Sequence, residues 1–213
     1  HLDMLRTMER AVIRSGIPIA FSEGFNPHPK MSYGNALALG VESQGEYVDI
    51  EIEDDIEVKE FLERINEQLP DGIKFVKGQE IDPKTPSLSS IIVYGEYIFN
   101  IDLEVPLSKE FVKSRVLNFV KSKEIIITKK NKKGKKVEVD IRPMIRNFDL
   151  VSLDDNRVTF VSTIATGSKA NLNINILIPQ ILDMLNLDMD PREVGVLRRD
   201  LYKVEDGQLV TPL

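Results

Sequence analysis

The sequence contains no cysteine and no tryptophan, and it has only two histidines among its 213 residues. Without a thiol, the chain forms no disulfide and supplies no cysteine nucleophile, cysteine-based zinc site or thiolate-held iron–sulfur cluster. Long apolar runs are also lacking, since stretches such as 91–93 and 125–127 are far shorter than the ~20 residues of a membrane-spanning helix. We therefore expect a cytoplasmic protein that has no membrane segment.

The net charge of −6 is an average of unlike regions. Residues 121–146 include ten basic and three acidic side chains, a local charge of +7, which leaves −13 on the remainder. Residues 42–67 carry eleven acidic and two basic side chains, or −9. Such a distribution disfavours nucleic-acid binding over the whole surface and favours it at the basic segment. In the alternative interpretation, both regions are solvated faces that keep the chain soluble.

The spacing of apolar residues predicts the order helix, strand, strand, helix, strand over the first part of the chain. These elements are expected at 3–15, 17–21, 47–53, 56–69 and 73–81. A strand before His1 would complete the βαββαβ order of a ferredoxin-like unit. We therefore expect residues 1–82 to form a ferredoxin-like module that lacks its opening strand in this chain. A proline-containing linker, 82–87, is expected to follow.

A similar order of elements predicts a second module over residues 88–213. The expected elements are a strand at 91–103, a helix capped by Ser108, hairpins at 124–141 and 148–164, a helix that starts at Pro179, and a strand at 194–204. The predicted fold class is therefore α+β, with two ferredoxin-like modules and mainly antiparallel sheets.

The segment 22–30, with the sequence SEGFNPHPK, combines two prolines with a glycine. The prolines restrict the backbone and the glycine permits a sharp turn, so the loop could hold side chains in a fixed arrangement. His28 is of the residue type that acts as a general acid or base, with Glu23 to orient it. The neighbouring polar residues are expected to bind substrate: Ser22, Asn26 and Lys30. In the alternative interpretation, the segment is only a tightly folded connection.

Six lysines surround the predicted turn at 129–136 and are expected to contact a nucleic-acid backbone without reading its sequence: Lys129, Lys130, Lys132, Lys133, Lys135 and Lys136. Four arginines offer bidentate contacts to phosphate or carboxylate: Arg142, Arg146, Arg198 and Arg199. Alternatively, the lysines form a solubilising tip and the arginines pair with surface acids. Because the two histidines lack a zinc-motif spacing, we expect no metal site.

Five motifs resemble those of the bacterial radical SAM-linked family of unknown function. They are HLDMLRTMER at 1–10, SEGFNPHPK at 22–30, LGVES at 39–43 with GEY at 45–47, VDIRP at 139–143, and RRDLY at 198–202. Members of that family are encoded beside, or fused behind, a radical S-adenosylmethionine protein with a cobalamin-type domain, often near genes of RNA metabolism. The resemblance implies such a protein as partner. S-adenosylmethionine and the iron–sulfur cluster would belong to the partner, with no cofactor in this chain.

Three functions remain open. The leading hypothesis is an accessory protein that binds tRNA or rRNA and presents it to the radical SAM partner for modification. The second is a stand-alone enzyme that acts on RNA or a small molecule, with His28 and Glu23 as acid and base. The third is a structural interaction protein that binds no nucleic acid. The sequence specifies neither the substrate nor the oligomeric state.

Overall fold

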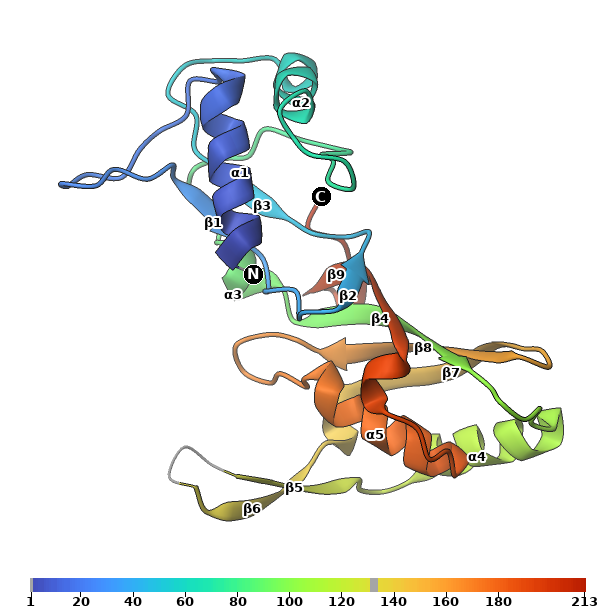
Figure 1. Ribbon diagram of the computed structural model, residues 1–213. Helices are drawn as coiled ribbons and strands as arrows, with labels where there is room; N and C mark the ends of the chain where they lie inside the picture. The colour runs from blue at the N-terminus through green and yellow to red at the C-terminus, as the bar shows by residue number, and fades with distance from the viewer. Residues whose placement is uncertain (1, 131–133) are drawn as a thin grey trace. The chain divides into compact units, whose positions relative to one another are not determined.

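The computed structural model describes residues 2–130 and 134–213. The chain divides into two compact units, of which unit 1 comprises 1–39, 47–91 and 212–213, and unit 2 comprises 40–46 and 92–211 (Figure 1). Helices and mainly antiparallel strands occur in both units, so the fold is α+β. The expected linker, 82–87, falls inside unit 1. In the part of the chain described, no helix has the length and apolar character needed to cross a membrane.

Unit 1 contains three helices and two short strands within its described residues: α1 (Leu2–Ser15), β1 (Met31–Tyr33), β3 (Val48–Ile50), α2 (Val58–Asn66) and α3 (Leu88–Ile91). Strands β1 and β3 pair in antiparallel fashion. The predicted strand at 17–21 is reduced to isolated bridges, from Ile19 to Ile52 and from Phe21 to Pro29.

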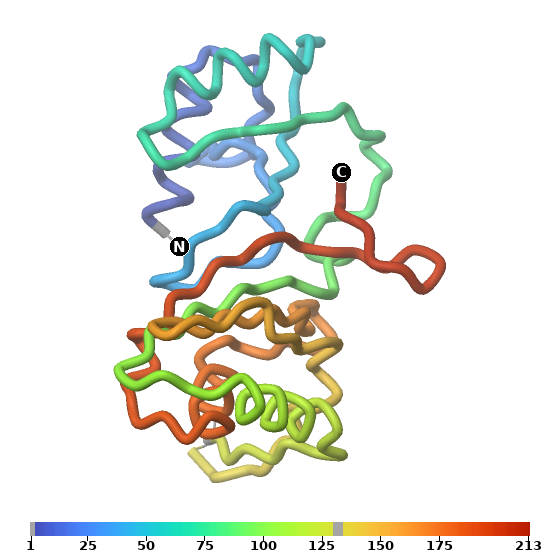
Figure 2. Tube along the Cα trace, turned by 90° about the vertical axis from the view of Figure 1, so that its right-hand side faces the viewer, coloured from blue at the N-terminus to red at the C-terminus, as the bar shows by residue number. Residues whose placement is uncertain are grey.

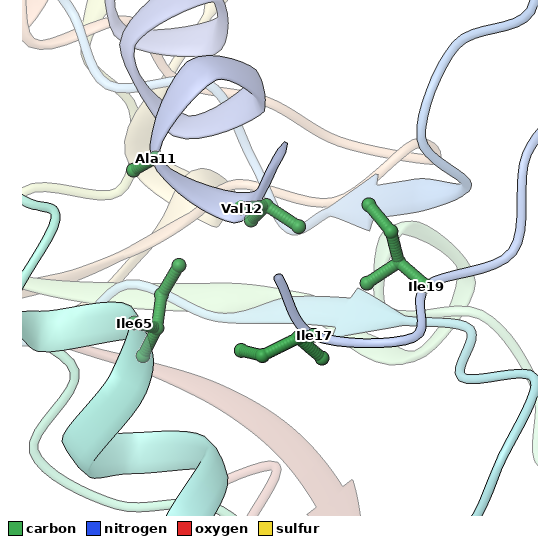
Figure 3. Close-up of a cluster of buried hydrophobic side chains, with 5 residues drawn as sticks. All are labelled: Ala11, Val12, Ile17, Ile19 and Ile65. Carbon is green, nitrogen blue, oxygen red and sulfur yellow. The ribbon is translucent and has the colours of Figure 1, made fainter. Parts of the chain in front are cut away.

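The core of unit 1 lies between α1 and α2. Ala11 and Val12 of α1 and Ile65 of α2 are fully buried, together with Ile17 and Ile19 from the segment that follows α1 (Figure 3). Each large aliphatic side chain removed from water in this way contributes about 1.5–3 kcal/mol to folding. This cluster explains why Ile17 and Ile19 are buried although the 17–21 segment forms almost no strand, while Phe21 at its end is exposed.

Arginine side chains join the ends of the two helices. Arg64 of α2 donates to the carbonyl oxygens of Ser15 and Gly16 at the end of α1. Arg14 of α1 donates to the carbonyl of Gln68, just beyond α2, at 2.8 Å. The last carbonyls of a helix have no partner inside the helix, so these contacts satisfy acceptors that would otherwise depend on water.

The strand predicted at 73–81 is wrong, because these residues form no ladder. Phe75 instead donates its N–H to the side chain of Asn66 and accepts a hydrogen bond from the same side chain. Its ring packs edge-on against Phe61, with the centroids 6.1 Å apart. The apolar residues that suggested a strand therefore reach the core from an irregular segment, and unit 1 lacks the closing strand that a βαββαβ order requires.

Unit 2 is built around a larger sheet. Its elements are β2 (Val41–Ser43), β4 (Tyr94–Asp102), α4 (Lys109–Lys121), β5 (Ile126–Lys130), β6 (Lys136–Asp140), β7 (Ile145–Leu153), β8 (Arg157–Ala165), α5 (Ile174–Leu185), β9 (Gly195–Glu205) and β10 (Gln208–Val210). The strand order is β10-β9-β4-β8-β7 with every neighbouring pair antiparallel, and β2 joins β9 in parallel. Strands β5 and β6 form a separate hairpin.

Helices α4 and α5 cover one face of this sheet (Figure 1). Figure 2 shows both helices again on that face after a turn of 90°. Phe119 of α4 packs against Phe148 of β7, which stacks on Phe160 of β8, with 5.0 Å between centroids in each pair. Aromatic contacts of this kind stabilise a core beyond the area they bury. They fix α4, and with it the start of the β5–β6 hairpin, on the sheet.

Several predicted elements of unit 2 are confirmed. Ser108 accepts the N–H of Phe111 at the start of α4, and β5–β6 and β7–β8 are hairpins. The helix predicted to start at Pro179 starts earlier, because Asn173 caps it and accepts the N–H of Asn175. Pro179 therefore lies inside α5.

Candidate functional site

The 22–30 loop is closed at its base by backbone hydrogen bonds. Ser22 donates its N–H to the carbonyl of His28 at 2.8 Å, and the His28 N–H donates to Ser22 Oγ at 3.0 Å. Lys30 donates its N–H to the carbonyl of Ala20 at 2.8 Å. The Ser22 hydroxyl is therefore engaged in shaping the loop. Beyond this base, the segment extends outward from unit 1 (Figure 1).

The side chains of the 22–30 loop are mostly exposed, and the expected acid–base pair is not assembled. Within the described residues, Glu23 and His28 make no hydrogen bond with each other. Lys30 Nζ lies 2.9 Å from Glu51 Oε2, and this contact raises the pKa of Lys30. Phe25, which sequence reasoning passed over, exposes 106% of its reference area.

The β5–β6 hairpin places basic residues at paired positions. Lys130 pairs with Lys136 in the antiparallel register, and Lys129 pairs with Val137. Lys129, Lys135 and Lys136 are exposed. Among the residues described, Lys129 and Lys136 have no ion-pair partner. Two further lysines of the predicted set, Lys132 and Lys133, lie outside the described residues.

Two side chains fasten the base of this hairpin. Asp140 accepts the N–H groups of Ile125 and Arg142 at 2.9 Å each. The Arg142 guanidinium donates from Nη1 to the carbonyl of Ile145 and from Nη2 to that of Val120, both at 2.8 Å. Contrary to the expectation of a phosphate contact, Arg142 is directed at backbone carbonyls, and it links the end of α4 to the start of β7.

Arg198 is also an internal residue rather than a surface contact for substrate. It is 2% exposed, and its Nη1 lies 3.0 Å from both carboxylate oxygens of Glu46. Its Nε donates to Tyr97 Oη at 3.2 Å, and its guanidinium lies 5.6 Å from the Tyr97 ring centroid. Loss of hydration raises the pKa of Glu46, although Arg198 and the Ser43 hydrogen bond act to lower it. A buried guanidinium with these partners is not accessible to a phosphate group. The prediction that Arg198 binds substrate is therefore wrong.

Arg146 and Arg199 remain exposed and lie on one face of the sheet of unit 2. Arg146 lies over the Tyr94 ring, 5.3 Å from its centroid, and donates to the carbonyl of Gly207 at 3.3 Å. Arg199 pairs with Glu96 at 3.3 Å. Tyr94 and Glu96 are two residues apart on β4, so their side chains point to the same side. Both arginines therefore lie on the side of β4 that carries Tyr94 and Glu96.

Sequence reasoning missed the partners that decide these roles. Glu46 and Tyr97 come from distant segments, and no local pattern identifies the carboxylate that receives Arg198. The exposure of Phe25 could have been predicted, because Phe25 lies between two typical turn residues, Gly24 and Asn26.

A comparison with curated protein sequences finds no match. Among solved structures, "Crystal Structure of a Cbf5-Nop10-Gar1 Complex" is similar with a TM-score of 0.43 and 14% identity over 81% of this chain. This chain spans 39% of the length of that chain. Residues 1–174 match the family described as "Uncharacterized protein conserved in bacteria (DUF2344)", and the chain belongs to that family.

Proposed function

We propose that this chain binds RNA through the lysines of the β5–β6 hairpin. The observation that carries the proposal is the group of exposed lysines that the hairpin holds close together in space: Lys129 on β5, Lys136 on β6 and Lys135 just before β6. Like charges that are held close together on a small hairpin repel one another. A polyanion that lies along the hairpin relieves this repulsion and releases its own counterions.

The base of the hairpin supports this role. A two-stranded hairpin alone is marginally stable in water. Here Asp140 closes the base of the hairpin by accepting the N–H groups of Ile125 and Arg142. Arg142 joins that base to α4 and β7 through its hydrogen bonds to the carbonyls of Val120 and Ile145. Because the base of the hairpin is fixed, the backbone that carries the lysines loses less conformational entropy when RNA binds.

The resemblance to the radical SAM-linked family supports the second part of the proposal. The chain is an accessory protein that presents tRNA or rRNA to a radical SAM partner. The radical chemistry belongs to the partner's S-adenosylmethionine and iron–sulfur cluster. No contact among the described residues favours a stand-alone enzyme built on Glu23 and His28.

We also propose that unit 2 is ferredoxin-like. The order β4, α4, β7, β8, α5, β9 is a βαββαβ sequence, and the antiparallel sheet order β9-β4-β8-β7 supports that arrangement. On this interpretation, the β5–β6 hairpin is an insertion between the first helix and the second strand.

A gel shift with tRNA over a series of salt concentrations tests RNA binding. The test variant replaces Lys129, Lys135 and Lys136 with Gln. The matched control removes three exposed lysines from unit 1: Lys74, Lys77 and Lys84. We expect the slope of log K against log salt to become shallower by about 2–3 in the test variant, at ~0.7–0.9 per lost phosphate contact. Equal slopes in the two variants, or no binding at low salt, would contradict the proposal.

A further inference from the structure

Phe25 occupies the tip of the 22–30 loop with its ring in solvent. Its exposed fraction, 106% of the reference area, is the highest among the large apolar side chains that the structure describes. The preceding Gly24 has φ of 125°, a backbone conformation that residues with a side chain rarely adopt. Pro27 restricts the backbone two residues later. The backbone on both sides of Phe25 is therefore restricted, and the ring between these residues is fully exposed.

The loop behind Phe25 is already ordered. Ser22 and His28 exchange two hydrogen bonds across its base, and the bridge between Phe21 and Pro29 continues the pairing. A partner that binds such a loop has little backbone freedom to remove, so more of the contact free energy appears as affinity.

The charges around the loop decide what kind of partner fits. Lys30 Nζ lies 2.9 Å from Glu51 Oε2, and this carboxylate raises the pKa of Lys30, with smaller effects of the same sign from Glu23 and Glu53. Unit 1 as a whole contains nine basic and fifteen acidic residues, a net charge of −6. A unit with this net charge repels a phosphate backbone and attracts lysine and arginine side chains.

We propose that the 22–30 loop is a docking element for a protein whose surface has an apolar pocket rimmed by lysine or arginine side chains. Phe25 fills the pocket, and Glu23 faces the basic rim. Aromatic side chains that enter a pocket at the centre of an interface commonly supply most of the binding free energy. This contact is separate from RNA binding by the β5–β6 hairpin.

Photocrosslinking tests the proposal on the full chain. The photoreactive residue p-benzoylphenylalanine is placed at position 25 in bacterial cells, and at position 39 in the control. Leu39 is 98% exposed and also belongs to unit 1, so it matches Phe25 in exposure. We expect one dominant protein adduct at position 25 that is absent at position 39. Mass spectrometry of the crosslinked peptide should place it in an apolar pocket bordered by basic residues.

The crosslinked protein is then purified and titrated with the unmodified chain and its variants. Phe25→Ala should weaken binding at least about 30-fold, the loss typical of a central anchor. Phe25→Trp should retain most of the affinity, Glu23→Lys should weaken it, and Leu39→Ala should change it less than twofold. Phe25→Ala should leave the thermal unfolding temperature and the salt slope of RNA binding unchanged.

Several results would overturn the proposal. In the crosslinking experiment, these are no adduct at position 25, an adduct to RNA or to a second copy of this chain, or the same adducts at positions 25 and 39. In the titration, it is a loss of affinity below threefold for Phe25→Ala. An unchanged salt slope in the hairpin lysine variant would instead contradict only the RNA proposal.

Discussion

Arg198 Nη1 lies 3.0 Å from both carboxylate oxygens of Glu46, although 152 positions of sequence separate the two residues. Ser43 reinforces the pair, since its hydroxyl donates to Glu46 Oε1 and also contacts the carbonyl of Arg198. The short strand β2 and the residues after it are thereby joined to β9 by side chains as well as by the backbone ladder.

Replacing Glu46 with Ala should destabilise unit 2 by about 1–3 kcal/mol, because a buried guanidinium is left without its carboxylate. The lower part of the range applies because the Glu46 side chain is 42% exposed and water can partly replace it. Urea denaturation gives the free energy of unfolding. Glu42→Ala, at an exposed position on β2, is the control and should have little effect. Equal losses for the two variants would show that the pair contributes nothing.

Replacing Gly45 with Ala should also destabilise unit 2, by about 1–3 kcal/mol. An added Cβ would lie 2.6 Å from the Cα of Asp200, so the backbone beside β9 has to move. Gly195→Ala is the matched control, because a Cβ there has its nearest neighbour at 3.6 Å, an ordinary contact. Thermal unfolding of the two variants compares them directly, and a Gly45→Ala variant as stable as Gly195→Ala would refute the expected clash.

Arg142→Lys keeps the positive charge and removes the two-pronged contact with the carbonyls of Val120 and Ile145. We expect faster hydrogen exchange at the amides of β5 and β6, with exchange in β9 unchanged. The salt slope of RNA binding should stay the same because the charge is retained. Unchanged exchange in β5 and β6 would mean that Asp140 alone fixes the hairpin.

Tyr33 gives a prediction at high pH. Burial raises the pKa of Tyr33 to about 12, and the neighbouring Glu9 adds to the effect. The folded chain keeps this proton while the unfolded chain loses it near the ordinary pKa of ~10. The contribution to stability is therefore complete below pH ~10 and declines as the pH rises to about 12.

The difference in tyrosinate absorbance between the unchanged chain and Tyr33→Phe isolates this titration from that of Tyr202, whose pKa is also raised by burial. The difference should rise near pH 12. A difference curve centred near 10 would place the Tyr33 hydroxyl in water.

The elements predicted well from sequence were those with local signals. The β5–β6 and β7–β8 hairpins follow from alternating residues on both sides of a turn, and the start of α4 follows from the cap at Ser108. The errors arise where distant residues decide the outcome. The 73–81 segment reads as a strand, but Asn66 satisfies the backbone of Phe75.

The sequence predicted which segments make up the candidate site, but it did not predict the role of each arginine. The sequence indicated a basic hairpin and a constrained 22–30 loop, and both are present. It could not distinguish arginines that face solvent from those that hold the fold together. Arg198 depends on a carboxylate from a remote segment, and Arg142 depends on where α4 ends.

The parallel pairing of β2 with β9 has a consequence for biosynthesis. Val41–Ser43 leaves the ribosome roughly 150 residues before the strand that receives it, so this contact raises the contact order of the whole domain. Until β9 is synthesised, β2 has no ladder partner and β4 is paired only with β8. A nascent or truncated chain that ends before Gly195 therefore leaves β2 and one edge of β4 unpaired, and these are the places where self-association of incomplete chains should begin.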